Sequence, residues 1–165
     1  MVNMKRLILA IAILLSCFAG RAQSIGLIDL NNLTSLKSEQ IDDYFTAGKI
    51  FKLQVGEEQD GVVIKHWLVM NPKAGKTEIV FTGKGFKTAA GDILHNASYQ
   101  TNDPQNIYNL INQTKGAGLK LTFQGADNKD NIYIYDSFLY HVVFKLSFDQ
   151  TVGTVDITQK FAFTQ

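Results

Sequence analysis

The stretch that decides the fold class is residues 138–164, FLYHVVFKLSFDQTVGTVDITQKFAFT. Apolar side chains alternate with polar ones in both of its halves, and the residues between the halves begin with Asp149 and end with Gly153. A period of two is the pattern of a strand that buries one face, and Asp and Gly are typical of turns. The stretch therefore predicts a long antiparallel hairpin with two apolar stripes: Phe138, Tyr140, Val142, Phe144, Leu146 and Phe148, then Val155, Ile157, Phe161 and Phe163.

Shorter runs predict the remaining strands. Further strands are expected at 62–70, 77–82 and 131–135, and the run 62–70 is apolar at nearly every position, which is typical of a strand covered on both faces. Two more runs alternate, and the apolar residues of each are expected to share one face of their strand: Phe51, Leu53 and Val55 in one, and Leu119, Leu121 and Phe123 in the other. One polar face per strand is typical of an antiparallel sheet.

Two helices are predicted between these strands. The first begins at Ser38, whose hydroxyl is expected to cap free amides, and Gly48 suits its left-handed end. The second begins at Asp103-Pro104 and runs to about Lys115, because Asp is a good cap and Pro is tolerated in the first turn. Both helices have one apolar face, so each is expected to pack on the sheet.

The elements follow in the order helix, three strands, a loose segment at Gly83–Thr101, helix and four strands. The two halves share an order of elements but no residue pattern, so no repeat is predicted. The expected fold class is α+β: mainly antiparallel β-sheet, curled or barrel-like in one alternative, with two short packed helices.

The N-terminus has the pattern of a secretory signal. Lys5 and Arg6 precede an apolar run, and small residues precede a cleavage site between Ala22 and Gln23. We therefore expect residues 1–22 to be a signal peptide and residues 23–165 to be a single α+β domain exported to the periplasm or outside the cell. In the alternative, Leu14-Leu15-Ser16-Cys17 resembles a bacterial lipobox, Cys17 is lipidated, and the protein is an outer-membrane lipoprotein.

Composition excludes several classes of function. Cys17 is the only cysteine, so the predicted mature domain has neither disulfides nor a thiol nucleophile. Both arginines, Arg6 and Arg21, lie in the predicted signal, and the remaining lysines form no basic stripe, so a nucleic-acid partner is not expected. Apart from the signal, no apolar run is long enough for a transmembrane helix.

No motif predicts a catalytic residue, a metal site or a cofactor. Gly75-Lys76-Thr77 imitates a phosphate-binding loop but lacks the earlier glycine and the following helix, so it is interpreted as a turn. His66, His95 and His141 lack metal-ligand spacing, and Ser137 beside Asp136 is not a nucleophile signature. Two further residue groups have structural interpretations: Glu57, Glu58 and Asp60 as a solvated turn, and Tyr133 with Tyr135 as one packed strand face.

From Lys49 onward the layout resembles the hemolysin-coregulated proteins, the tube subunits of type VI secretion. Residues 49–57 are similar to that family's opening strand and Gly-Glu turn, and Gly75-Lys76 before Glu78–Phe81 is similar to its third strand. Residues 104–116 resemble its Pro-initiated helix, and the closing hairpin resembles its terminal strands. The resemblance implies a subunit of stacked hexameric rings. The Ser38 helix and the signal are additions to the family's pattern.

Three functions stay open from the sequence. The preferred one is an exported, non-enzymatic binding or structural protein that associates with a protein partner or with itself, tube-forming in the extreme case. The second is a lipid or small-ligand carrier with a pocket lined by Phe138, Phe144, Phe148 and Phe161. The third is a small cone-shaped α+β enzyme that uses His66, His141 and a carboxylate such as Asp136.

Overall fold

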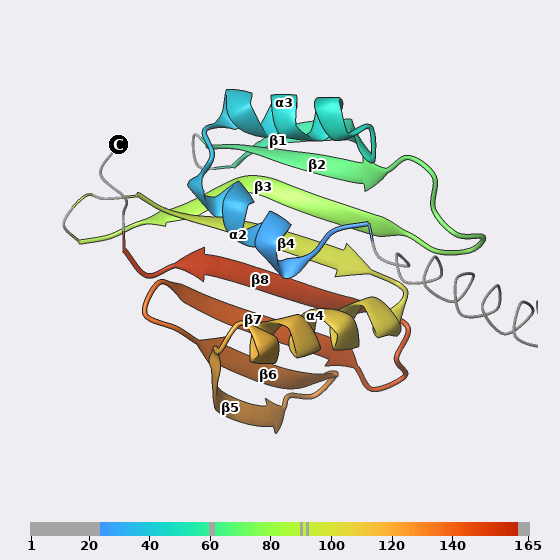
Figure 1. The fold of residues 1–165 in the computed structure, drawn as a ribbon, viewed down its shortest axis with the longest axis vertical. Helices are drawn as coiled ribbons and strands as arrows, with labels where there is room; N and C mark the ends of the chain where they lie inside the picture. The colour runs from blue at the N-terminus through green and yellow to red at the C-terminus, as the bar shows by residue number, and fades with distance from the viewer. Residues whose placement is uncertain (1–23, 60–61, 90, 92, 162–165) are drawn as a thin grey trace, which may run out of the picture.

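The structure of the protein is a computed structural model that describes residues 24–59, 62–89, 91 and 93–161 (Figure 1). Cys17, Ala22 and Gln23, the predicted lipidation and cleavage residues, lie outside the described residues, as do Asp60 and Phe163. The elements follow in the order α2 (Leu27–Ser35), α3 (Ser38–Gly48), β1 (Phe51–Gln59), β2 (Val62–Val69), β3 (Glu78–Lys87), β4 (Ile93–Thr101), α4 (Pro104–Gly116), β5 (Lys120–Ala126), β6 (Asp130–Asp136), β7 (Tyr140–Ser147) and β8 (Gly153–Gln159).

The strands form one antiparallel sheet of eight strands in the order β1-β2-β3-β4-β8-β7-β6-β5. Each half of the chain contributes a meander, and the two meanders join where β4 pairs with β8. The predicted α+β class with mainly antiparallel sheet is confirmed. The sheet is open, with β1 and β5 at its edges, so it does not close into the barrel considered as an alternative.

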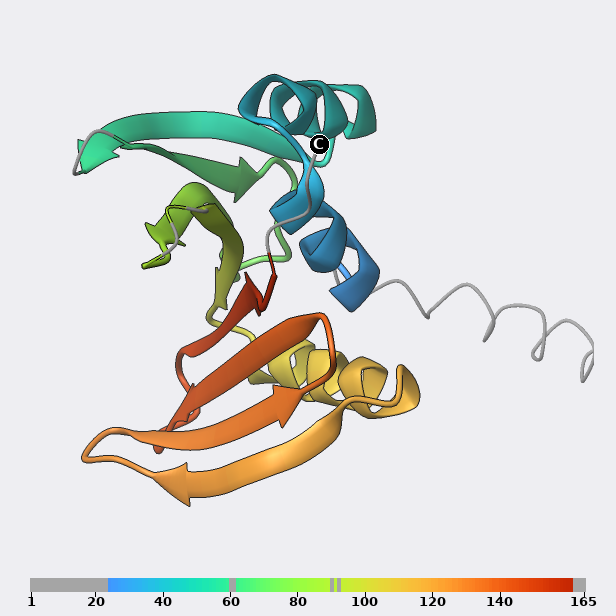
Figure 2. The ribbon, with the colours of Figure 1, turned by 90° about the vertical axis from the view of Figure 1, so that its left-hand side faces the viewer.

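The helices α2, α3 and α4 lie on the same face of the sheet (Figures 1 and 2). One hydrophobic core lies between them and the sheet. The Phe45 ring of α3 lies 5.2 Å from the ring of Phe51 and 4.7 Å from that of Trp67. Ile107 and Leu110 of α4 are fully buried. Burial of this apolar surface is the main favourable contribution to the free energy of folding.

The closing hairpin follows its predicted pattern only inside the strands. Val142, Phe144, Leu146, Val155 and Ile157 are buried as predicted. The prediction was wrong beyond the strand ends, because three aromatic residues lie in turns or past β8 and are exposed: Phe138 (78%), Phe148 (54%) and Phe161 (50%).

The chain holds more regular structure than predicted. The segment 83–101, expected to be loose, contains the end of β3 and all of β4. A bulge between Thr82 and Gly85 shifts the register of these strands, and this extra residue interrupts the period-two pattern that would have identified them. A third helix, α2, precedes the predicted pair and buries Leu27, Leu30 and Leu33.

The predicted helices are present with small corrections. α4 has Asp103 at its N-cap, where the side chain accepts from the amide of Gln105, and Pro104 in its first turn. In α3, Lys37 is the N-cap residue and Ser38 is the first helical residue, so the predicted serine cap was wrong. The left-handed residue at its end is Lys49 rather than Gly48.

Each edge strand contains a bulge that reverses the side its apolar residues face. The register of β1 against β2 shifts between Leu53 and Val55, and that of β5 against β6 shifts between Leu121 and Phe123. Val55 and Phe123 therefore lie on the face away from the helices, and the prediction that each trio shares one face was wrong. Bulges at sheet edges increase the twist and discourage edge-to-edge pairing with other chains.

The two halves share a residue pattern that was not recognised in the sequence. Residues 51–55, FKLQV, match residues 119–123, LKLTF, in residue type and in the position of the bulge. Leu53 pairs with the buried Trp67, and Leu121 pairs with the buried Tyr135. Both halves therefore contain a four-stranded meander whose edge strand has its bulge at the same place.

The register at the join fits a two-fold relation between the halves. Ser98 of β4 pairs with Asp156 of β8, and Tyr99 and Ala97 pair with Val155 and Ile157 on either side. Rotation about an axis through the Ser98–Asp156 pair exchanges the two outer pairs. The two meanders therefore present the same kind of surface on either side of this axis.

Candidate functional site

The face of the sheet opposite the helices is covered by no described helix, and we call it the open face. Figure 2 shows the twisted sheet with the helices on one side of it, so the open face is the opposite side. One row of paired residues crosses it from β1 to β5, and we call this the central row: Val55, His66, Phe81, Ser98, Asp156, Val143, Ile134 and Phe123.

The two ends of the central row are apolar and accessible. Val55 is 46% exposed and Phe123 is 49% exposed, at opposite edges of the sheet. Phe81, Val143 and Ile134 are half-buried between them. A Cβ atom at Gly125 would overlap the Phe123 ring. The absence of a side chain at Gly125 therefore provides the space that the ring occupies over the strand. Both halves of the molecule therefore contribute an apolar anchor to the open face.

The centre of the row is polar. The Ser98 hydroxyl donates a short hydrogen bond to Asp156 Oδ1, at the position of the two-fold axis. Both residues are half-buried, and the neighbouring pairs of the same strands on this face, Gln100 with Thr154 and Asn96 with Thr158, are also polar. Asp156 keeps a second carboxylate oxygen with which a partner could form a hydrogen bond.

His66 connects the polar centre with the β1 edge. Its ring lies 4.7 Å from the Phe81 ring in an edge-to-face arrangement. Its Nε2 atom is buried, and Glu57 Oε1 lies 3.4 Å away, which is an ion-pair distance rather than a well-formed hydrogen bond. This nitrogen is therefore buried beside Glu57 without a well-formed hydrogen bond.

A shallow cavity of about 330 Å³ lies on the open face between β1 and β8. Its wall combines apolar side chains of β2 and β3 with polar and charged groups: Glu57, His66, Lys145, Ser98 and Asp156. This mixture of an apolar surface with a few converging polar groups is the composition of recognition sites. His66 and Ser98 lie on strands separated by β3, roughly 10 Å apart from strand spacing, so they cannot form a nucleophile–base pair.

A second polar cluster lies at the end of β6 and β7. Lys160 Nζ, Thr122 Oγ1 and His141 Nδ1 lie 2.5, 2.6 and 3.0 Å from the Asp136 carboxylate. Partial burial acts to raise the pKa of Asp136, but these hydrogen bonds outweigh burial and hold the pKa well below its usual range. The rings of Phe138 and Phe161 lie 5.0 Å apart, one in the turn after β6 and one after β8.

The three residues of the enzyme hypothesis, His66, His141 and Asp136, do not all lie together in the structure. His141 does pair with Asp136, but His66 lies on β2, separated from β7 by β3, β4 and β8. His95 lies in a different cavity, on the helix side. Ser137 Oγ accepts hydrogen bonds from the amides of Leu139 and Tyr140, which is a turn role. No cluster with metal-ligand geometry is found among the described residues.

The remaining predicted groups have structural roles. Gly75 has a positive φ, and the amide of Thr77 donates to Asn102, so Gly75-Lys76-Thr77 is a turn as predicted. Glu57 and Glu58 lie on β1 rather than in a turn. Tyr133 and Tyr135 pack against the core on one strand face, as predicted.

The phenylalanine pocket of the carrier hypothesis is not formed. Phe144 is fully buried in the core below the helices, whereas Phe138, Phe148 and Phe161 are exposed. The run 62–70, predicted to be covered on both faces, forms β2, but Val63 of this strand is 53% exposed on the helix side, so the prediction was wrong at this end of the strand.

Sequence analysis missed the polar centre of the open face. Ser98 and Asp156 come from different halves of the chain and meet only because β4 pairs with β8. The usable signal was the alternation of Asn96, Ser98 and Gln100 with Ala97, Tyr99 and Thr101, which indicates a strand with one polar face.

Comparisons with protein-family models, with curated proteins and with solved structures find no match to this chain. The resemblance to the hemolysin-coregulated proteins therefore stays a prediction. Within the described part of the chain, no helix is both long and apolar enough to cross a membrane.

Proposed function

We propose that this protein is an exported, non-enzymatic binding protein that holds a protein partner against its open face. The observation that carries the proposal is the central row, which crosses the open face with accessible apolar residues on both sides of a polar centre. Exposed apolar surface at this scale is unusual unless something covers it.

The open face is large enough for a stable complex. Eight strands at a spacing of ~4.8 Å and a length of ~7 residues give an area of roughly 38 by 23 Å. A standard protein interface covers about 800 Å² on each partner, which is about the area of this face. The expected partner surface offers apolar groups for Val55 and Phe123 and a hydrogen-bond donor for Asp156.

The test compares protein capture by open-face and helix-side variants. Val55→Asp and Phe123→Asp each place a charge at one end of the central row, on side chains that are already half-exposed. Ile28→Asp is the matched control, because Ile28 is 74% exposed on α2, on the other side of the sheet. Each purified variant is immobilised, incubated with the exported proteins of the source cells and analysed by quantitative mass spectrometry.

We expect one partner to be retained by the wild type and by the Ile28 variant, and to be lost at least about tenfold from both open-face variants, which corresponds to 1.4 kcal/mol. Light scattering on the same samples detects a second copy of the chain as the partner. The proposal fails if the wild type is a strict monomer and the captured proteins are the same for all variants.

A further inference from the structure

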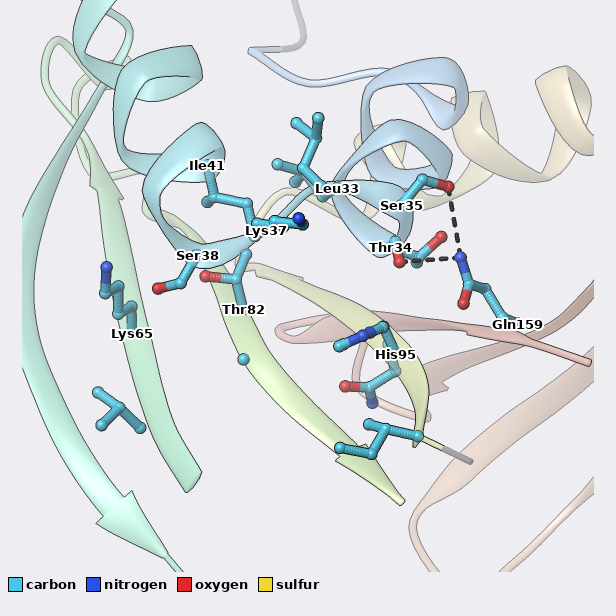
Figure 3. Close-up of a pocket in the computed structure, with 15 residues that line it drawn as sticks. Leu33, Thr34, Ser35, Lys37, Ser38, Ile41, Lys65, Thr82, His95 and Gln159 are labelled. Atoms are coloured by element: carbon cyan, nitrogen blue, oxygen red, sulfur yellow. Dashed lines mark hydrogen bonds between the residues drawn. The ribbon is translucent and has the colours of Figure 1, made fainter. Parts of the chain in front are cut away.

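A separate cavity of about 660 Å³ lies on the helix side, between the connection of α2 to α3 and strands β2, β3, β4 and β8. Its volume is within the range of ~300–1,000 Å³ typical of small-molecule sites. Figure 3 shows Lys65 and His95 on opposite sides of this cavity, with Lys37 and Thr82 between them. We call it the α2–α3 cavity.

The charged groups that line the α2–α3 cavity are the ammonium groups of Lys37 and Lys65, and no Asp or Glu is among its described lining residues. Asp42, outside the lining, accepts from Lys65 Nζ at 2.6 Å through both carboxylate oxygens and so fixes the lysine in place. The ammonium group of Lys37 forms no ion pair with a described residue. The excess positive charge therefore favours an anion.

The other wall of the cavity is apolar. Leu33 and Ile41 come from α2 and α3, Leu36 comes from the connection between them, and Val63 and Ile93 come from β2 and β4. Val63 and Ile93 are more than half exposed although they lie on the helix side, because no described helix reaches this end of the sheet. A ligand tail placed here would remove apolar surface from water at about 25 cal/mol per Å².

The floor of the cavity is rigid. Gly83 has a φ of 91°, and a Cβ atom there would overlap the backbone carbonyl of Val63. Gln159 is buried and donates to the Thr34 carbonyl at 2.9 Å, which holds the end of β8 to the end of α2. The cavity is therefore built by contacts between elements that are distant in the chain, and it does not depend on an exposed loop alone.

From this geometry we propose that the α2–α3 cavity binds a small amphipathic carboxylate. The carboxylate lies at the unpaired ammonium group of Lys37, and the alkyl tail lies along Val63, Ile93 and Ile41. This site is independent of the open face, so it adds a ligand to the proposed partner-binding function without resting on it.

The experiment uses three probes that distinguish the contribution of the carboxylate group from that of the alkyl tail. Sodium decanoate carries both, decanol carries only the tail, and inorganic phosphate carries only an anionic charge. Isothermal titration calorimetry on the purified protein is expected to show decanoate binding with a Kd below about 1 mM, and decanol and phosphate binding at least about tenfold more weakly.

Two variants and two controls locate the site. Lys37→Glu reverses the unpaired charge, and Val63→Trp fills the cavity from an exposed wall position. Lys73→Glu changes an exposed lysine in the β2–β3 turn, and Val152→Trp enlarges an exposed residue in the β7–β8 turn. We expect both cavity variants to weaken decanoate binding at least about tenfold and both controls to leave it unchanged. Circular dichroism and thermal unfolding verify that each variant is folded.

Three results would overturn the proposal: no decanoate binding by the wild type, equal affinity for decanol, or full affinity in the folded Val63→Trp variant. None of these readouts involves the captured partner. Failure of this site and failure of the open-face function can therefore be told apart, because Val63→Trp leaves the central row unchanged.

Discussion

At the scale of single residues, the core contains a buried carboxylate, that of Glu78, which is 6% exposed. It accepts from the Tyr99 hydroxyl at 2.7 Å and from the Ser24 hydroxyl at 3.0 Å. The Asn106 amide in turn donates to Tyr99. Burial, together with the nearby negative charge of Glu78, raises the pKa of Tyr99 far above its usual range, so it stays a neutral donor. These bonds connect β3, β4, α4 and the start of the described chain.

Tyr99→Phe should destabilise the protein by about 1–3 kcal/mol, because it removes the hydroxyl that donates to the buried Glu78 carboxylate and accepts from the buried Asn106 amide. Urea unfolding monitored by circular dichroism measures this change. Tyr133→Phe is the matched control, since the Tyr133 hydroxyl has no hydrogen bond to another described residue, and it should change stability by less than about 0.5 kcal/mol. Equal effects of the two variants would contradict a role for the Glu78 network.

The Asp136 cluster should make stability depend on pH in the acid range. Its folded pKa lies below the unfolded value of about 3.9, so its contribution is present above that pH and is lost as pH falls further. Because Asp136 is partly exposed, screening limits the contribution to about 1 kcal/mol. Asp136→Asn should therefore be less stable than the wild type at pH 7.

The stability difference between Asp136→Asn and the wild type should shrink as pH falls from about 5 to about 2. Urea unfolding at a series of pH values tests this, with Asp43→Asn, an exposed change on α3, as the control. A difference that stays constant across this range would show that the variant acts through packing rather than charge.

At the scale of elements, α4 lies directly on the backbone of β8. A Cβ atom at Gly153 would overlap the side chain of Ile107, which is fully buried. Gly153→Ala should therefore force α4 away from the sheet and cost about 1–3 kcal/mol. Gly116→Ala, where nothing lies within contact distance, should be neutral or stabilising. Thermal unfolding of both variants measures the effect, and a neutral Gly153 variant would mean that α4 can shift without loss of packing.

The elements that were predicted correctly are those whose signals are local. Asp103 and Pro104 define the start of α4 through their own backbone chemistry, and the alternation in 140–147 needs only one buried face. The bulges at Val55 and Phe123 were not predictable, because an extra residue is decided by the partner strand. α2 was missed because Gly26 gives a weak start signal and its polar residues mask three buried leucines.

At the scale of the whole molecule, the candidate site is a product of topology. The central row takes one residue from every strand, and no sequence window contains more than a small part of it. Phe123 was recognised as apolar, but its alternation with polar residues predicted that it faces the core rather than the open face. The α2–α3 cavity is also non-local, because Lys37, His95 and Gln159 come from three distant segments.

The pairing of β4 with β8 has a consequence for when the protein becomes able to bind. Every other strand pair joins strands that are consecutive along the chain. The β4–β8 pair instead closes a long loop, which has a higher entropic cost. A chain in which β4 and β8 have not paired would have two separate meanders, each with only half of the central row. The protein would therefore become able to bind its partner across the whole open face only after this strand pair has formed, so binding would report that folding is complete.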